Sequence, residues 1–232
     1  MTQRFQAATS ATASARPESA ARLAIGLSVA FLGLLFVLHF LEPEFDPSWR
    51  MISEYETGPY GWMMRLAFFC WGGSVLALIT ALWSSLRRLS GAISRGWLLV
   101  IGVALIGAGV FATNAITDDV QSTPNTLHTI CGVIIIFTFP IAASLASRSL
   151  AGNPDWTTDR RWLFWLTFLV WLGLIGFFGS IILSNAINPA AGRVGPEVYQ
   201  GWPNRFMVVV YNVWLMVVAR RAARQPTHAL PR

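Results

Sequence analysis

Long apolar runs separated by short polar loops dominate the pattern of the chain. Crossing a hydrocarbon core of about 30 Å takes roughly 20 helical residues. Six runs approach or exceed this length: residues 23–41, 61–86, 96–116, 127–147, 161–185 and 205–219. Backbone polar groups have no water partner in lipid, so these runs must form helices rather than open strands. The pattern therefore predicts an all-α integral membrane bundle of six transmembrane helices.

The flanking segments differ from these runs in composition. Residues 1–21 are rich in Ala, Ser and Thr with little apolar bulk, which predicts a disordered N-terminal tail. Residues 22–220 then form the transmembrane domain, and residues 221–232 form a basic C-terminal tail. The first apolar run begins only at Leu23 and has no small-residue cleavage site after it, so we expect an uncleaved anchor rather than a signal peptide.

Basic and acidic residues fall on alternate loops. Thirteen of the seventeen arginines lie in the two tails and in the second and fourth loops, whereas eight of the eleven acidic residues lie in or beside the first, third and fifth loops. The positive-inside rule then places both termini in the cytoplasm. We expect a multi-pass protein of a prokaryotic plasma membrane whose partners are membrane lipids. Because the arginines border apolar segments, the net charge of +6 does not indicate nucleic-acid binding.

Polar groups collect at the outer ends of the predicted helices. The first loop, HFLEPEFDPSWRMISEYETGPYGW, holds five carboxylates, and the segment TPNTLH begins the fourth run, where Thr123 can cap a helix with Pro124 in its first position. We expect an outward-facing site that binds a lipid headgroup or a small polar ligand. Its predicted members are Ser53, Glu54, Asp118, His128 and Arg205.

Ionisable groups at membrane depth are costly and need partners. For His128 we expect Asp118 or Asp119, which lie nine or ten residues earlier across a short loop. For Arg205 we expect Glu54 or one of the same aspartates. On the sequence alone, a structural role, in which these pairs only hold helix ends together by hydrogen bonds and ion pairs, is favoured over chemistry.

Two other functions, an enzyme and a transporter, remain open on the sequence. A membrane-embedded hydrolase or lipid-modifying enzyme would use Ser53 as nucleophile, His128 as base and Asp118 or Asp119 as its orienting acid, although no G-x-S-x-G motif surrounds Ser53. A zinc site of His39, His128 and Asp118 lacks the usual spacing, so we expect no metal or other cofactor. A transporter would need polar residues at the membrane midplane, where Asn212 is the main exception to an apolar pattern.

Several motifs resemble a known family. The segments HFLEPEFDPSWRMISEYETGPYGWMMRLAFFCWG, GVFATNAITDD, LHTICGVIIIFTFPIAA and GWPNRFMVVVYNVWLMVVARR are similar to the bacterial and archaeal membrane family catalogued as domain of unknown function 998, over roughly residues 23–222. The resemblance implies a six-span membrane protein without a settled activity. Members commonly carry an aspartate soon after the GVF step, whereas this chain has Asn114 there and Asp118 and Asp119 later.

Overall fold

The computed structural model describes residues 2–119, 122–189 and 195–224, and it describes side chains from residue 17 onward. The described residues are predominantly helical and contain no strand. Six long helices run through the molecule: α1 (Thr2–Leu41), α2 (Gly61–Leu82), α3 (Leu89–Val110), α4 (Thr123–Ala151), α5 (Arg160–Ile187) and α6 (Gly201–Ala223). Two short 3-10 helices, η1 (Ile52–Thr57) and η2 (Pro154–Asp159), lie in the first and fourth loops. The predicted all-α class is confirmed.

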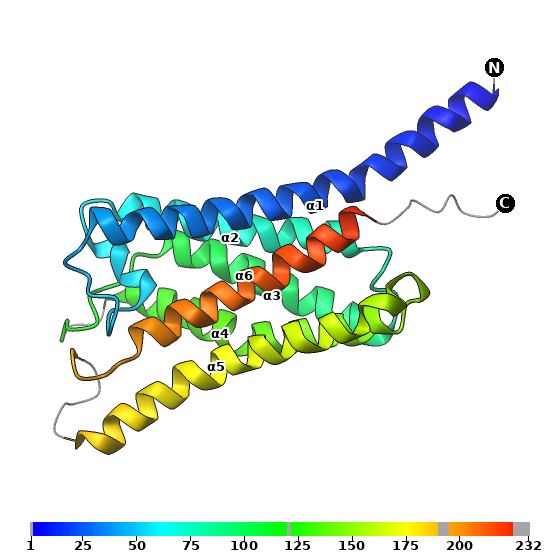
Figure 1. Cartoon of the computed structure of the whole chain (residues 1–232). Helices are drawn as coiled ribbons and strands as arrows, with labels where there is room; N and C mark the ends of the chain where they lie inside the picture. Colours follow the sequence, from blue (N-terminus) through cyan, green and yellow to red (C-terminus); the bar gives the residue numbers. More distant parts are fainter. Residues whose placement is uncertain (1, 120–121, 190–194, 225–232) are drawn as a thin grey trace.

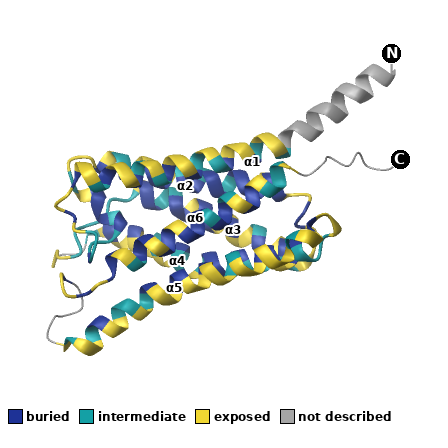
Figure 2. Ribbon diagram, viewed as in Figure 1, coloured by how far each residue is buried: buried dark blue, intermediate teal, exposed yellow. Residues whose placement is uncertain are grey.

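The helices form a closed ring in chain order. Each helix packs against the next one along the chain, and α6 returns to pack against α1 (Figure 1). All six are long and apolar enough to cross a membrane. Buried residues face the inside of the bundle, and exposed residues form its outer surface (Figure 2). Many of the exposed side chains are large and apolar, such as Phe36, Ile182 and Trp162, which is the pattern expected where lipid replaces water.

The helix ends differ from the predicted ends by several residues. Helix α3 begins at Leu89 and ends at Val110, so the segment up to Ile116 belongs to a loop instead of the span. The cap of α4 also differs from our expectation. Its N-cap is Ser122, whose hydroxyl accepts the Asn125 N–H at 3.2 Å, and Thr123 is already helical. Hydropathy alone misses such terminal turns, because their side chains are polar or small.

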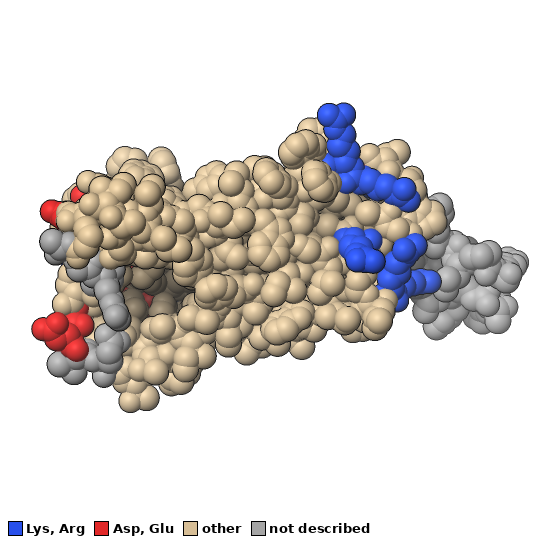
Figure 3. Space-filling model, turned by 90° about the horizontal axis from the view of Figure 1, so that it is seen from below, with Lys and Arg blue, Asp and Glu red and all other residues tan. Residues whose placement is uncertain are grey.

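The predicted tails stay predictions. The backbone of residues 2–21 continues α1, and residues 225–232 lie outside the described part of the chain. The two ends of the bundle nevertheless carry opposite charges: acidic side chains gather at one end and arginines at the other (Figure 3).

A polar cluster joins α1, α2 and α6 at the centre of the bundle. Ser28 Oγ donates to Asn212 Oδ1 at 3.1 Å and lies 2.9 Å from Ser74 Oγ. All three residues are fully buried. The amide of Asn212 donates within its own helix to the Val208 carbonyl at 3.0 Å. Every polar side chain in the cluster is thus hydrogen-bonded, and Asn212 joins α6 to α1.

Replacing Asn212 with alanine is expected to destabilise the bundle by about 1 kcal/mol, the usual size of a hydrogen bond between membrane helices. The loss arises because Ser28 then lacks its acceptor on α6. Unfolding of the purified protein by denaturing detergent measures it. The matched control is Thr138→Ala, since the Thr138 hydroxyl bonds only to the Ile134 carbonyl of its own helix. Equal losses in both variants would contradict a cross-helix role for the cluster.

Candidate functional site

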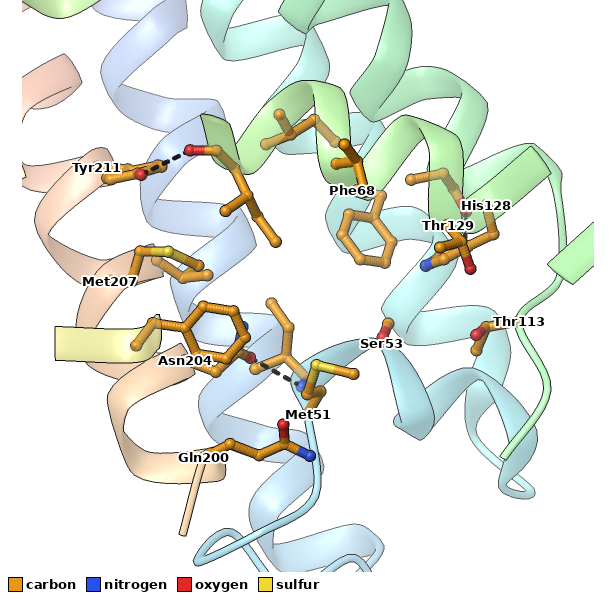
Figure 4. Close-up of a pocket in the computed structure, with 18 of the residues that line it drawn as sticks. Met51, Ser53, Phe68, Thr113, His128, Thr129, Gln200, Asn204, Met207 and Tyr211 are labelled. Carbon is orange, nitrogen blue, oxygen red and sulfur yellow. Dashed lines mark hydrogen bonds between the residues drawn. The ribbon is translucent and has the colours of Figure 1, made fainter. Parts of the chain in front are cut away.

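A cavity of about 400 Å³ lies among α2, α4, α5, α6, η1, and the end of α3 with the loop that follows it, at the acidic end of the bundle (Figure 4). Apolar side chains make up most of its wall. The polar members are Ser53, Thr113, His128, Thr129, Gln200 and Asn204. This volume lies within the usual range of small-molecule pockets, which are mostly apolar with a few polar groups.

The lining changes from polar to apolar along the helices. On α4, His128 and Thr129 come within two turns of the helix start, and Ile136 lies two turns further in. On α6, Asn204 lies in the first turn and Tyr211 two turns deeper. Tyr211 does not present a free hydroxyl to the cavity, because it donates to the Ile136 carbonyl at 3.0 Å (Figure 4). The cavity is therefore polar near the acidic end of the bundle and apolar toward the middle.

His128 is buried in the wall of this cavity. Its Nδ1 lies 3.0 Å from the Ala108 carbonyl oxygen and 2.9 Å from that of Phe111, at the end of α3. Both partners are acceptors, so Nδ1 carries the proton, and in the neutral ring Nε2 is the acceptor. No described residue hydrogen-bonds to Nε2. The ring of Phe68 contacts the imidazole edge-on, with ring centroids 5.7 Å apart. The residue thus presents a fixed hydrogen-bond acceptor.

Glu56, which we did not predict as a site residue, lies next to the Nδ1 side of the His128 ring. Its Oε1 is 3.9 Å from His128 Nδ1 and has no hydrogen-bond partner among the described residues, while its Oε2 accepts the Thr113 N–H at 3.3 Å. Burial raises the pKa of this carboxyl to about 7, against smaller lowering effects of the Thr113 N–H and the charge of Arg65. The carboxyl is therefore balanced between its neutral and charged forms near neutral pH.

Ser53 and Glu54 have different surroundings although they are adjacent. Ser53 lines the cavity, as His128 does. Glu54 does not line the cavity and is 1 % exposed. Its Oε1 accepts from Arg50 Nη1 at 2.7 Å and from the Ile116 N–H at 2.9 Å, and its Oε2 accepts the Met51 N–H at 3.0 Å. Glu54 therefore ties the first loop to the third and is not available to a ligand.

The two aspartates are exposed and do not reach His128. Asp118 Oδ2 instead accepts the Ala115 N–H at 3.1 Å, which closes a local turn. Asn114, where the resemblance led us to expect an aspartate, accepts from the Ser122 hydroxyl at 2.8 Å. The expected pairing of His128 with an aspartate is thus wrong. The carbonyl oxygens of Ala108 and Phe111 hydrogen-bond to His128 instead, and Glu56 is the carboxylate near it.

Arg205 is 5 % exposed and is surrounded by uncharged acceptors. Its Nε donates to His39 Nε2 at 2.7 Å. Nη1 donates to the carbonyl oxygens of Arg50 at 2.6 Å and Gly201 at 3.2 Å, and Nη2 donates to the Tyr55 hydroxyl at 3.2 Å. The guanidinium thereby joins α6 to α1 and to the first loop.

These contacts correct one expectation and argue against the zinc alternative. Arg205 forms no ion pair with Glu54 or with any other described carboxylate. The zinc alternative also fails at His39, because its Nδ1 lies 2.7 Å from the Leu35 carbonyl oxygen while its Nε2 accepts from Arg205. Both ring nitrogens are occupied. In the described part of the chain, no three His, Cys, Asp or Glu side chains are grouped to hold a metal ion.

Of the predicted site residues, the cavity brings together only Ser53 and His128. The residues that sequence reasoning missed are Glu56, which backs His128, and Thr113, Thr129, Gln200 and Asn204, which supply polar lining. Asn204 also accepts the Ile52 N–H at 3.2 Å, which holds η1 against α6. The sequence signal that could have identified Asn204 as a site residue is its position in the GWPNR segment, one residue before Arg205.

A family model agrees with the motifs and with the six-helix structure. The model described as "Protein of unknown function (DUF998)" matches residues 23–221, which is most of the chain. No curated protein and no solved structure matched the chain. The chain is thus a multi-pass, all-α membrane protein, and it belongs to the family Protein of unknown function (DUF998).

Proposed function

We propose that this protein binds one amphiphilic lipid in the cavity, with a hydrogen-bonding headgroup toward the acidic end of the bundle and an apolar chain toward its middle. The observation that carries the proposal is the graded lining. Hydroxyl, amide and imidazole groups gather near the helix ends, where Ile52 and Ile116 also line the cavity, and the lining one to two turns deeper is aromatic and aliphatic. A purely polar solute would leave the deeper wall without a partner, and a hydrocarbon would leave the polar groups unpaired.

The headgroup of this ligand is uncharged or zwitterionic. Arg205, which we expected to bind a ligand, is not a lining residue, and its donors are taken by His39, Tyr55 and backbone carbonyls. Glu54 is likewise paired. The groups that face the cavity are hydrogen-bonding but formally neutral, such as Thr129 and Gln200. They suit hydroxyl, ester or amide groups of a lipid.

The proposed location is the plasma membrane of a prokaryote, with both termini in the cytoplasm. The distribution of charge supports this orientation, because arginines mark the cytoplasmic side of membrane proteins and collect here at the end opposite the cavity (Figure 3). The cavity then opens near the outer leaflet.

Filling the cavity should abolish lipid retention. Gly132 lines it, and a Cβ built on this glycine would meet nothing within 4 Å, so a larger side chain can enter the space without a backbone clash. The variant Gly132→Leu is expected to lose at least about 90 % of the lipid that stays bound after detergent extraction, because the isobutyl group occupies the ligand's volume. Native mass spectrometry of the purified protein, incubated with a total bacterial lipid extract, counts the bound molecules.

Gly33→Leu is the matched control. Gly33 lies on the exposed side of α1, away from the cavity, and its Cβ would also meet nothing within 4 Å. The control should retain lipid as the unmodified protein does. Equal retention in Gly132→Leu and the unmodified protein would contradict the proposed binding site.

A second candidate function rests on one observation: Ser53 and His128 line the same cavity, and Nδ1 of His128 is held so that Nε2 can accept a proton. A hydrolase would use Ser53 as nucleophile and His128 as base, and the Glu56 carboxyl would orient the imidazole in place of an aspartate. A fluorophosphonate probe tests this directly. An enzyme should be labelled at Ser53, and His128→Gln should abolish the labelling. An unlabelled Ser53, in protein that retains lipid, would leave binding as the function.

A further inference from the structure

The opposite end of the bundle holds a separate groove between α5 and α6, with a volume of about 260 Å³. It has no lining residue in common with the cavity described above. Its wall contains two arginines of α6 and one at its C-cap, one aspartate, two tryptophans and four aliphatic side chains: Trp156, Asp159, Trp162, Leu163, Leu166, Val217, Val218, Arg220, Arg221 and Arg224.

Only one of the three arginines is neutralised. Arg221 Nε donates to Asp159 Oδ2 at 2.7 Å, and its guanidinium carbon lies 5.3 Å from the centre of the Trp156 ring. Arg220 and Arg224 are exposed and form no ion pair with any described residue. They are four residues apart, so their like charges lie on one helix face and repel each other. An anion between them would remove this repulsion.

The part of the groove lined by Leu163, Val217 and Val218 is apolar and continuous with the lipid-facing surface. Leu163 and Val218 are buried in its floor, whereas Val217 is 41 % exposed and Trp162 is 69 % exposed. Trp side chains at such positions favour the boundary between headgroups and hydrocarbon. The groove therefore offers two exposed cations beside an apolar slot, which a free inorganic anion would use only in part.

We infer that this groove binds an anionic phospholipid, with its phosphate between Arg220 and Arg224 and an acyl chain along Leu163, Leu166 and Val217. Charge complementarity and the apolar slot together specify this occupant. Basic pockets between membrane helices on the cytoplasmic side are suited to such headgroups. This site is independent of the lipid cavity and binds a lipid of different charge in the opposite leaflet.

The test compares the affinities of phosphatidylglycerol and phosphatidylcholine for the full-length protein, measured by native mass spectrometry from neutral detergent micelles. Phosphatidylglycerol should bind more tightly. The double variant Arg220→Gln/Arg224→Gln should weaken it roughly 30-fold, which corresponds to about 1 kcal/mol for each cation near the membrane surface. Phosphatidylcholine binding should not change.

The control variant is Arg148→Gln/Arg161→Gln, which removes two exposed arginines at the same end that do not line the groove. It should leave phosphatidylglycerol affinity within about twofold. Leu166→Trp fills the slot without changing the charge and should also weaken binding. An equal loss in the control would show general charge attraction and overturn the inference, as would equal affinities for the two lipids. Displacement of phosphatidylglycerol by an equal concentration of inorganic phosphate would reduce the groove to an anion site.

Discussion

Arg205→Met is expected to destabilise the protein by about 3 kcal/mol, because hydrogen bonds from a charged group contribute roughly 1.5–3 kcal/mol each and are not additive. The guanidinium joins three segments through four acceptors: His39 on α1, Arg50 and Tyr55 in the first loop, and Gly201 on its own helix. Removing it leaves His39 Nε2, the Arg50 carbonyl and the Tyr55 hydroxyl without this donor. The unfolding midpoint in denaturing detergent measures the loss.

Arg205→Lys should recover only part of the stability. A lysine keeps the charge, but its single nitrogen cannot reach His39, Tyr55 and the carbonyls in three directions as the planar fork does. Arg161→Met, at an exposed position, is the control and should change the midpoint little. Full stability in Arg205→Lys would mean that charge alone matters, and stability within error in Arg205→Met would contradict the structural role.

Lowering the pH from 8 to 5 is expected to stabilise the protein, with Glu56 responsible for up to about 3 kcal/mol of the change. The pKa of this buried carboxyl rises from its ordinary 4.5 to about 7 in the folded protein, chiefly through desolvation. Between these two values the folded state holds a proton that the unfolded state has released. Stability therefore falls as the pH rises through this window and levels off above about pH 7.

Glu56→Gln isolates this contribution. The amide oxygen can still accept the Thr113 N–H, but the side chain no longer titrates. The variant should match the unmodified protein near pH 4.5 and exceed its stability at pH 8. Glu44→Gln, at an exposed position of the same loop, is the control and should keep the pH dependence. An unchanged pH profile in Glu56→Gln would show that the carboxyl is charged throughout.

The general architecture could be predicted because it follows from composition along the chain. Six apolar runs require helices in lipid, and polar residues at their ends mark where a site can form. The sequence therefore indicated the correct end of the bundle for Ser53 and His128. The apolar half of the cavity was not predictable, because residues such as Phe177 and Met207 are indistinguishable in sequence from lipid-facing or core residues.

The partners of the ionisable groups were predicted wrongly for a physical reason. We assigned carboxylates to His128 and Arg205, whereas the structure pairs His128 with two carbonyl oxygens at the end of α3. Arg205 donates to two carbonyl oxygens, an imidazole nitrogen and a tyrosine hydroxyl. Every residue carries a carbonyl, so no sequence signal marks these acceptors. Glu54 and Glu56 illustrate the same limit: within the 3-10 helix η1, two residues apart, they point to different sides, one toward Arg50 and one toward His128.

Photo-crosslinking in liposomes tests the central claim most directly. The probe is a phospholipid with a diazirine in the middle of an acyl chain, and mass spectrometry locates the labelled residues. Lipid inside the cavity should label Trp71, Phe177 and Met207, which are at most 4 % exposed and unreachable from the outer surface. Gly132→Leu should abolish this labelling but leave that of exposed Ile175 unchanged. Labelling confined to exposed residues such as Ile175, in both proteins, would contradict a lipid-binding cavity.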